Sequence, residues 1–240
     1  MSIEVTTHTI LRDLLRHQPT IIGWNHHLTM ARLVARGLRL SKSSLIQTGI
    51  ATHQIDGKYR ISYLIPALLW EGTVTIAIPA AFHDRLITIE LPQLQQWLGR
   101  SKLVYGGAQP PAPEFNGLWI VDAQTWLQLQ LDQPESLVCY PTIIDGADDL
   151  ESWAEELLTV RLNTHDWDRL RLSQTATIWE QIIGIKIQLM ESLWQRPDNP
   201  YNCYLLDDLD RSLLESLSKI ITTNLDSSWQ KFYQELSQLD

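Results

Sequence analysis

Short apolar runs alternate with amphipathic stretches over the first 160 residues. Runs typical of buried strands, rich in apolar and β-branched residues, occupy 44–49, 73–78, 102–105, 118–121 and 142–144. Apolar positions recur at helical spacing in 3–17, 26–40, 61–70, 80–98 and 124–131. Strands that alternate with helices indicate βα units. The pattern predicts an α/β fold with a mostly parallel sheet and helices on both of its faces.

The strand pattern disappears after this point. The remaining segments have helical periodicity and occupy 151–162, 174–195, 207–223 and 226–238. The chain is therefore predicted to divide into an α/β domain, residues 1–160, and an all-helical region, residues 161–240. Within the first domain, the polar segment 50–58 is expected to be a loop, and Pro92 is expected to kink or break the helix 80–98.

Composition and charge narrow the function. A formal net charge of −9 disfavours tight, independent binding of nucleic acid, which normally needs a basic surface. The two cysteines, Cys139 and Cys203, are too few for an iron–sulfur cluster. No apolar run approaches the ~18 residues of a membrane span, and the N-terminus lacks the pattern of a signal peptide. We expect a cytoplasmic protein without a membrane partner.

One helix carries a basic stripe. Arg32, Arg36 and Arg39 follow each other at i, i+4 and i+7, so they share one face of the predicted helix 26–40. Such a stripe is a candidate contact for nucleic-acid phosphates. The alternative is an ordinary solvated helix face.

An acidic residue ends the last predicted strand. Asp145 follows the apolar run Thr142–Ile144, and the carboxyl ends of parallel strands are where ligands gather in open α/β sheets. An aspartate at this point is a natural magnesium ligand or general base.

Three motifs in order resemble a known family. Gln47-Thr48-Gly49, Gly57-Lys58 and the following Ile61–Leu69 resemble the first motif and helix of the DinG/XPD-type superfamily-two DNA helicases. Thr75–Pro92 is similar to the next strand and helix of that family, and Ile143–Glu151 is similar to its "IIDEAHNLE" motif. The resemblance covers about residues 20–155 and implies the first RecA-like lobe of a P-loop NTPase. The helical remainder would match an insertion of that family.

The resemblance implies a site for ATP and magnesium. Thr48, Gly49, Gly57 and Lys58 would form the phosphate loop, and Asp145 would hold the magnesium ion. Trp24 and His27 fall where the family reads the adenine base. For these two residues the alternative is ordinary packing, and for the loop it is a degenerate surface segment.

The departures from the family remove most of the chemistry. Lys58 is followed by Tyr59-Arg60 in place of the Ser or Thr that binds magnesium. Gly146 replaces the glutamate that activates water, a loss worth ~10²–10⁴-fold in rate. We therefore name no catalytic residue. Asp148, Asp149 and Glu151 are better explained as acidic residues at a helix start.

Two hypotheses follow. The first is a degenerate helicase lobe that binds nucleotide weakly and acts in DNA transactions with a larger assembly, a protein partner or a second lobe. The alternative is a non-enzymatic protein-interaction scaffold derived from such a lobe. A functioning ATPase with relocated catalytic groups is a third, weaker reading.

Overall fold

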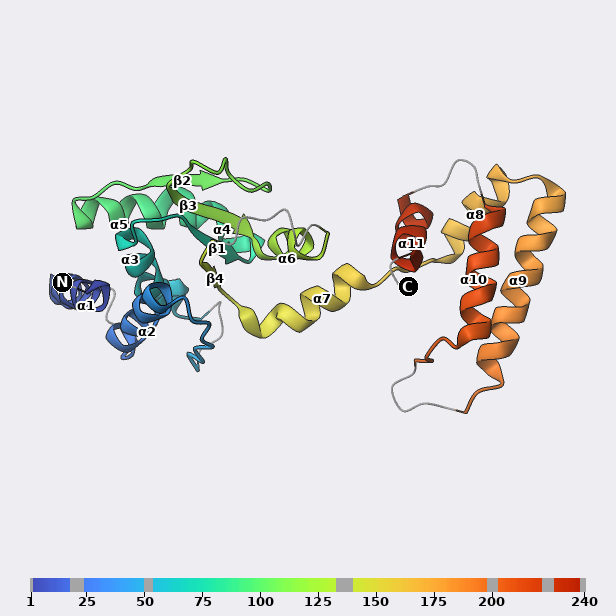
Figure 1. Cartoon of the computed structure of the whole chain (residues 1–240), viewed down its shortest axis with the longest axis horizontal. Coiled ribbons are helices and arrows are strands. Elements are labelled where there is room, and N and C mark those ends of the chain that lie inside the picture. The colour runs from blue at the N-terminus through green and yellow to red at the C-terminus, as the bar shows by residue number, and fades with distance from the viewer. Residues whose placement is uncertain are drawn as a thin grey trace. The chain divides into compact units, whose positions relative to one another are not determined.

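A computed structural model describes residues 2–17, 24–49, 54–132, 140–197, 203–221 and 227–237 (Figure 1). The chain separates into two compact units, Met1–Leu157 (unit 1) and Leu158–Asp240 (unit 2). Each unit is described by itself.

Unit 1 contains a four-stranded sheet in which all described pairs are parallel. Its strands are β1 (Val74–Ile78), β2 (Leu103–Gly106), β3 (Gly117–Asp122) and β4 (Thr142–Ile144), in the order β2-β3-β1-β4. The central strand β1 is buried along its whole length, which explains its unbroken apolar and β-branched sequence. The predicted α/β fold with a parallel sheet is confirmed.

Helices cover both faces of the sheet (Figure 1). Because successive strand residues point to opposite faces, Ile76 and Ile120 enter one core whereas Ala77 and Val121 enter another. The first core is built with α1 (Ile3–His17), α2 (His27–Leu40), α3 (Ile61–Leu69), α4 (Ala80–Arg85) and α5 (Leu91–Leu98). The second is covered by α6 (Ala123–Asp132) and α7 (Leu150–Leu158).

Two predictions before α3 were wrong. Residues 44–49 form no strand, and Leu45 is 87% exposed. Most of this segment is polar, and Ile46 alone packs partly against the core, so it has too little apolar surface to join the sheet. The predicted loop 50–58 lies outside the described residues at 50–53. From residue 54 it becomes a 3₁₀ helix, η2 (Gln54–Arg60), that leads directly into α3.

The predicted helix 80–98 is interrupted just before Pro92, where a kink or break was expected. A π-helical turn, η3 (Leu86–Glu90), joins α4 to α5, and Pro92 lies in the first turn of α5. A proline is tolerated there because its missing N–H has no helical partner to lose when the preceding turn is widened.

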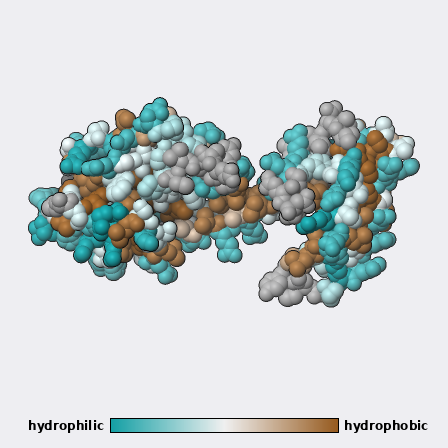
Figure 2. Space-filling view, viewed as in Figure 1, coloured by the Kyte–Doolittle hydropathy of each residue, from teal (hydrophilic) through white to brown (hydrophobic). Residues whose placement is uncertain are grey.

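Unit 2 consists of helices in its described part. These are α8 (Thr164–Ser173), α9 (Ala176–Trp194), α10 (Asp208–Ile220) and α11 (Ser227–Ser237). Sequence periodicity missed α8, which begins with a reciprocal capping box between Asn163 and Asp166. The core of the unit includes Ile182 and Trp229. Apolar surface also remains exposed along α9, including Ile187 and Trp194 (Figure 2).

Candidate functional site

Asp145 lies at the carboxyl end of β4, as the sequence predicted, but it is only 6% exposed. Its backbone N–H donates to the carbonyl of Ala77 at 2.9 Å, which extends the pairing of β4 with β1 by one residue. Gly146 follows with φ of 79°, a left-handed conformation that glycine adopts without strain. This turn directs the chain away from the sheet and leaves the carboxylate inside the protein.

Both oxygens of the Asp145 carboxylate accept hydrogen bonds from tyrosines. The Tyr59 hydroxyl donates to Oδ1 at 2.7 Å and the Tyr63 hydroxyl donates to Oδ2 at 3.0 Å. Tyr59 is in η2 and Tyr63 is one turn further on in α3, so a single helical segment presents both hydroxyls. A buried carboxylate needs such donors because it has lost its hydration.

A buried arginine adjoins the carboxylate. Arg60 is 1% exposed and forms a two-pronged ion pair with Glu90, with two N–O distances of 3.0 Å. Its Nη1 lies 3.8 Å from Asp145 Oδ2, and its guanidinium stacks over the Phe82 ring at 4.7 Å from the centroid. We call Tyr59, Arg60, Tyr63, Glu90 and Asp145 the buried network.

The arginine takes up the space beside the predicted phosphate loop. Gly57 has φ of 70°, and a Cβ at this position would overlap the Arg60 guanidinium. The glycine thus permits close approach of a cation from the same chain. In a phosphate loop, glycines instead permit close approach of the phosphates.

The charges of the network support one another. Burial raises the pKa of Asp145, while the Tyr59 hydrogen bond and Arg60 act to lower it. Burial, followed by the Asp145 charge, raises the pKa of Tyr59 and of Tyr63, so both hydroxyls keep their protons and donate. Burial acts to lower the pKa of Arg60, yet its bonds to Glu90 hold that pKa above the ordinary value. The network also reaches outside its five residues, because Arg85 Nε lies 3.1 Å from Glu90 Oε1.

Of the predicted phosphate-loop residues, Gly57 lies against the buried network. Gly57 lies against Arg60, but the Lys58 side chain is exposed at the surface. Thr48 is half-buried, and Gly49 is exposed with φ of 70° at the end of the unpaired segment. Neither Lys58 nor Gly49 forms a hydrogen bond with the buried network among the described residues.

The two residues predicted to read an adenine base lie in the core. His27 Nδ1 is 2.7 Å from the Ser62 hydroxyl, and both side chains are buried. The Trp24 ring meets His27 edge-on, with centroids 5.1 Å apart, and also approaches Tyr59 at 6.4 Å. Their surroundings match the packing alternative.

The residues present do not suit a magnesium ion at Asp145. Its two oxygens face hydroxyl donors, and the nearest charged group is a guanidinium cation. Magnesium requires several oxygen acceptors around it. Across the described residues, no set of three or more His, Cys, Asp or Glu side chains is positioned to hold a metal.

Sequence reasoning missed Tyr63 and Arg60 as partners of Asp145, and Glu90 as the partner of Arg60. A signal was present, because Arg60 directly precedes a helix that is apolar on every side. A charged residue joined to such a helix is buried only with a partner. The identity of that partner, 30 residues away, was not readable from the pattern.

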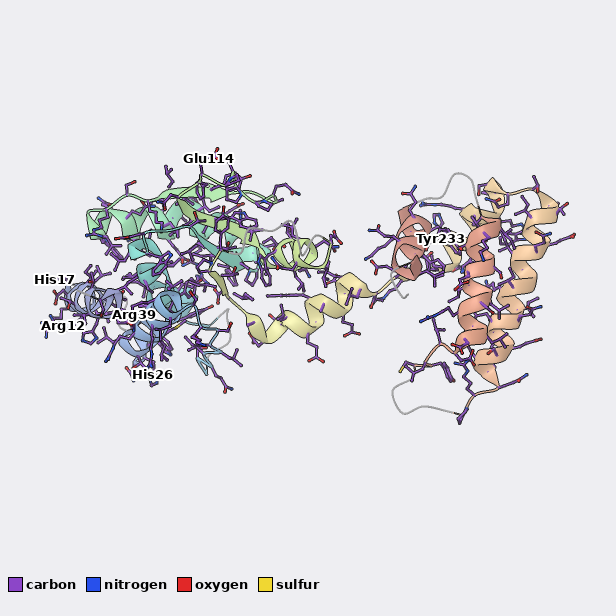
Figure 3. The ribbon with its side chains drawn as sticks, viewed as in Figure 1. Arg12, His17, His26, Arg39, Glu114 and Tyr233 are labelled. Atoms are coloured by element: carbon purple, nitrogen blue, oxygen red, sulfur yellow. The ribbon has the colours of Figure 1, made fainter. Side chains whose placement is uncertain are left out.

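The basic stripe on α2 faces solvent. Arg32 and Arg36 are exposed, and Arg39 Nε donates to Glu4 of α1 at 2.7 Å. Arg12 and Arg39 both project from the α1–α2 pair (Figure 3). Residues 1–49 hold six Lys or Arg and two Asp or Glu, a net charge of +4, which leaves −13 for the rest of a chain whose total is −9. The predicted contact with nucleic acid stays a prediction.

Comparison with known proteins gives no relative. No family model matches the chain, and no curated protein or solved structure matches it significantly. In the described part of the chain, no helix is both long and apolar enough to cross a membrane.

Proposed function

We propose that unit 1 is a helicase-like lobe of the DinG/XPD type whose nucleotide site is filled by its own side chains, and that the chain acts by binding other macromolecules. The proposal favours the scaffold alternative over an ATP-dependent enzyme. The order of the sequence motifs and the position of Asp145 at a strand end support the ancestry.

A single observation supports the proposal that the nucleotide site no longer binds magnesium and ATP. Tyr59 and Tyr63 donate to the two oxygens of Asp145, the aspartate that the resemblance assigns to the magnesium ion. Tyr59 also stands where the magnesium-binding hydroxyl of the family would be, with an aromatic ring in the space that a hydrated ion needs.

Thermal unfolding with and without magnesium and ATP tests the proposal. A ligand that binds only the folded state stabilises it by about 2.7 kcal/mol at a concentration of 100 Kd. We expect no rise in Tm and no release of phosphate. A rise in Tm that disappears in Lys58→Ala would contradict the proposal, and this variant is suitable because the Lys58 side chain is exposed.

Contact with nucleic acid is a second candidate function, favoured by the separation of charge along the chain. The α1–α2 pair carries most of the positive net charge of residues 1–49, and Arg32 and Arg36 are exposed on it. A local basic surface attracts phosphates at short range even on an acidic protein, because salt screens charges beyond about 10 Å at 0.1 M. Oligonucleotide binding that weakens with salt would support this function.

A further inference from the structure

A cleft of about 290 Å³ opens where β1, β2 and β3 end, and it is separate from the buried network. Its walls come from three places in the chain. Ala80, His83 and Asp84 belong to α4, Gly106–Ala108 are the last residue of β2 and the two that follow, and Asp122 and Thr125 mark the passage from β3 into α6.

The sheet topology gives this position its significance. Strands β1 and β3 are neighbours, and their last residues, Ile78 and Asp122, are paired in register. The helix after β1 packs into the first core, through Phe82 and Leu86, whereas α6 packs into the second core on the opposite face. Two adjacent parallel strands whose following helices leave to opposite faces create a crevice at their carboxyl ends, and open α/β sheets bind ligands in such crevices.

Local contacts fix the position of the chain at the end of β2, which forms one wall of the crevice. A Cβ at Gly106, the last residue of β2, would overlap the end of the Ile87 side chain, which would have to shift to accommodate it. The Trp119 indole N–H donates to the carbonyl of Gly107 at 2.9 Å and fixes the start of the following loop.

The side chains define which ligands fit. Asp122 Oδ1 accepts from the Thr125 backbone N–H at 3.0 Å, so one oxygen orients the start of α6. Among the described residues, Oδ2 has no such bond. Asp84 is fully exposed at the rim, and the His83 ring lies between its carboxylate and the Ile120 carbonyl, at 3.3 and 3.4 Å. Among the described residues, the lining has two carboxylates and no Lys or Arg, and the rest is mainly glycine and alanine.

We propose that this crevice binds a small organic cation, a primary ammonium or guanidinium group on a short apolar chain. Asp122 Oδ2 and Asp84 receive the cationic group, and the glycine and alanine surface accommodates the chain. The absence of basic residues from the lining makes phosphates and carboxylates unsuitable ligands, because two carboxylates would repel them. This inference does not rest on the proposed function, since none of its residues belongs to the buried network.

The test is an NMR titration of the ¹⁵N-labelled full-length chain with n-butylguanidinium, with 1-butanol as the uncharged control. We expect saturable shifts confined to the amides of residues 80–84, 106–108 and 122–125 with the cation, and none with the alcohol. Asp122→Asn keeps the helix cap, because asparagine caps as well as aspartate. It is expected to weaken binding about twofold to fivefold, the usual worth of a partly exposed ion pair.

The matched control is Glu114→Gln. It removes one negative charge from the same β2–β3 connection, near the other end of the sheet (Figure 3). Binding unchanged in Glu114→Gln but weakened in Asp122→Asn, and further in Asp84→Asn with Asp122→Asn, supports the proposal. Scattered or unsaturable shifts, equal shifts with 1-butanol, or equal weakening by Glu114→Gln would overturn it.

Discussion

The hydroxyl of Tyr59 donates a hydrogen bond to Asp145 Oδ1 at 2.7 Å, although the two residues are 86 positions apart in the chain. Under the proposed helicase ancestry, Tyr59 stands in place of the residue that would bind magnesium, and Asp145 is the residue that would share this ion. On that proposal, the hydrogen bond between the two side chains takes the place of the ion.

Removal of the Tyr59 hydroxyl is expected to destabilise unit 1. Tyr59→Phe leaves a buried carboxylate oxygen without its donor, which costs about 1–3 kcal/mol. Chemical denaturation measures the free energy of unfolding. The matched control is Tyr105→Phe, at a residue that is 37% exposed, with an expected change of less than about 0.5 kcal/mol. Equal effects of the two substitutions would mean that the buried hydrogen bond contributes nothing.

Breaking the pair between Arg60 and Glu90 is expected to cost more. Arg60→Met leaves the buried Asp145 carboxylate without its nearest cation, while Glu90 keeps its pair with Arg85, and loss of one partner of a buried pair costs about 3–5 kcal/mol. The double variant with Glu90→Leu should be less destabilised than the sum of the single variants. Arg12→Met removes a half-exposed pair with Asp13 and should cost about 1 kcal/mol or less. Strictly additive effects of Arg60→Met and Glu90→Leu would contradict the buried pair.

The tyrosines of the network predict a loss of stability at alkaline pH. Burial raises the pKa of Tyr59 and of Tyr63 in the folded state, whereas both ionise near pH 10 once unfolded. The folded state then binds more protons, so this contribution is complete below pH 10 and is lost as pH rises above it.

Lys102 acts in the opposite direction in part of this range. Its ammonium donates to backbone carbonyls that include those of Ala67 and Gly72, and burial lowers its pKa to about 8. Its lowered pKa makes stability rise with pH from about 8 to its ordinary value near 10.4. The test therefore compares the free energy of unfolding of the unaltered protein with that of Tyr59→Phe at each pH. The Lys102 contribution is the same in both proteins and cancels in the difference. The free energy of unfolding of Tyr59→Phe should fall less between pH 9 and 11 than that of the unaltered protein. Parallel curves of free energy against pH for the two proteins would refute a raised pKa at Tyr59.

The basic stripe predicts salt-dependent binding of an oligonucleotide. Each phosphate contact to single-stranded nucleic acid contributes about 0.7 to the slope of log K against log salt. Arg32→Ala and Arg36→Ala should each lower that slope, whereas Arg171→Ala, an exposed arginine of unit 2, should leave it unchanged. Fluorescence anisotropy at several salt concentrations gives the slopes. Equal slopes for all three variants would rule out a specific role for the stripe.

The regular elements of unit 1 were predictable because buried strands and helices have locally apolar sequences. Val74–Ile78 is β-branched and apolar since β1 is covered on both faces, and Ile61–Leu69 has an apolar residue at nearly every position because α3 is enclosed. The segment 44–49 was predicted as a strand from only two apolar residues, and it pairs with no strand among the described residues. A pair of apolar residues is too weak a signal to predict a strand.

The buried network was not predictable for a different reason. The sequence placed Asp145 at the end of a strand, and it showed that Tyr59 and Arg60 interrupt the magnesium motif. It did not show that the interrupting residues bind Asp145 and Glu90, because those contacts join segments far apart in the chain. The two residues that interrupt the motif, Tyr59 and Arg60, both interact with acidic side chains in the structure.

Isothermal titration calorimetry of the full-length chain with magnesium and ATP tests the central claim most directly. A filled site predicts no heat of binding at millimolar nucleotide, a concentration that would saturate any site with a Kd near 1 μM, or about −8 kcal/mol. Saturable heat with one nucleotide per chain, reduced by Lys58→Ala in a variant with unchanged thermal stability, would show that the buried network gives way to ATP and would contradict the account.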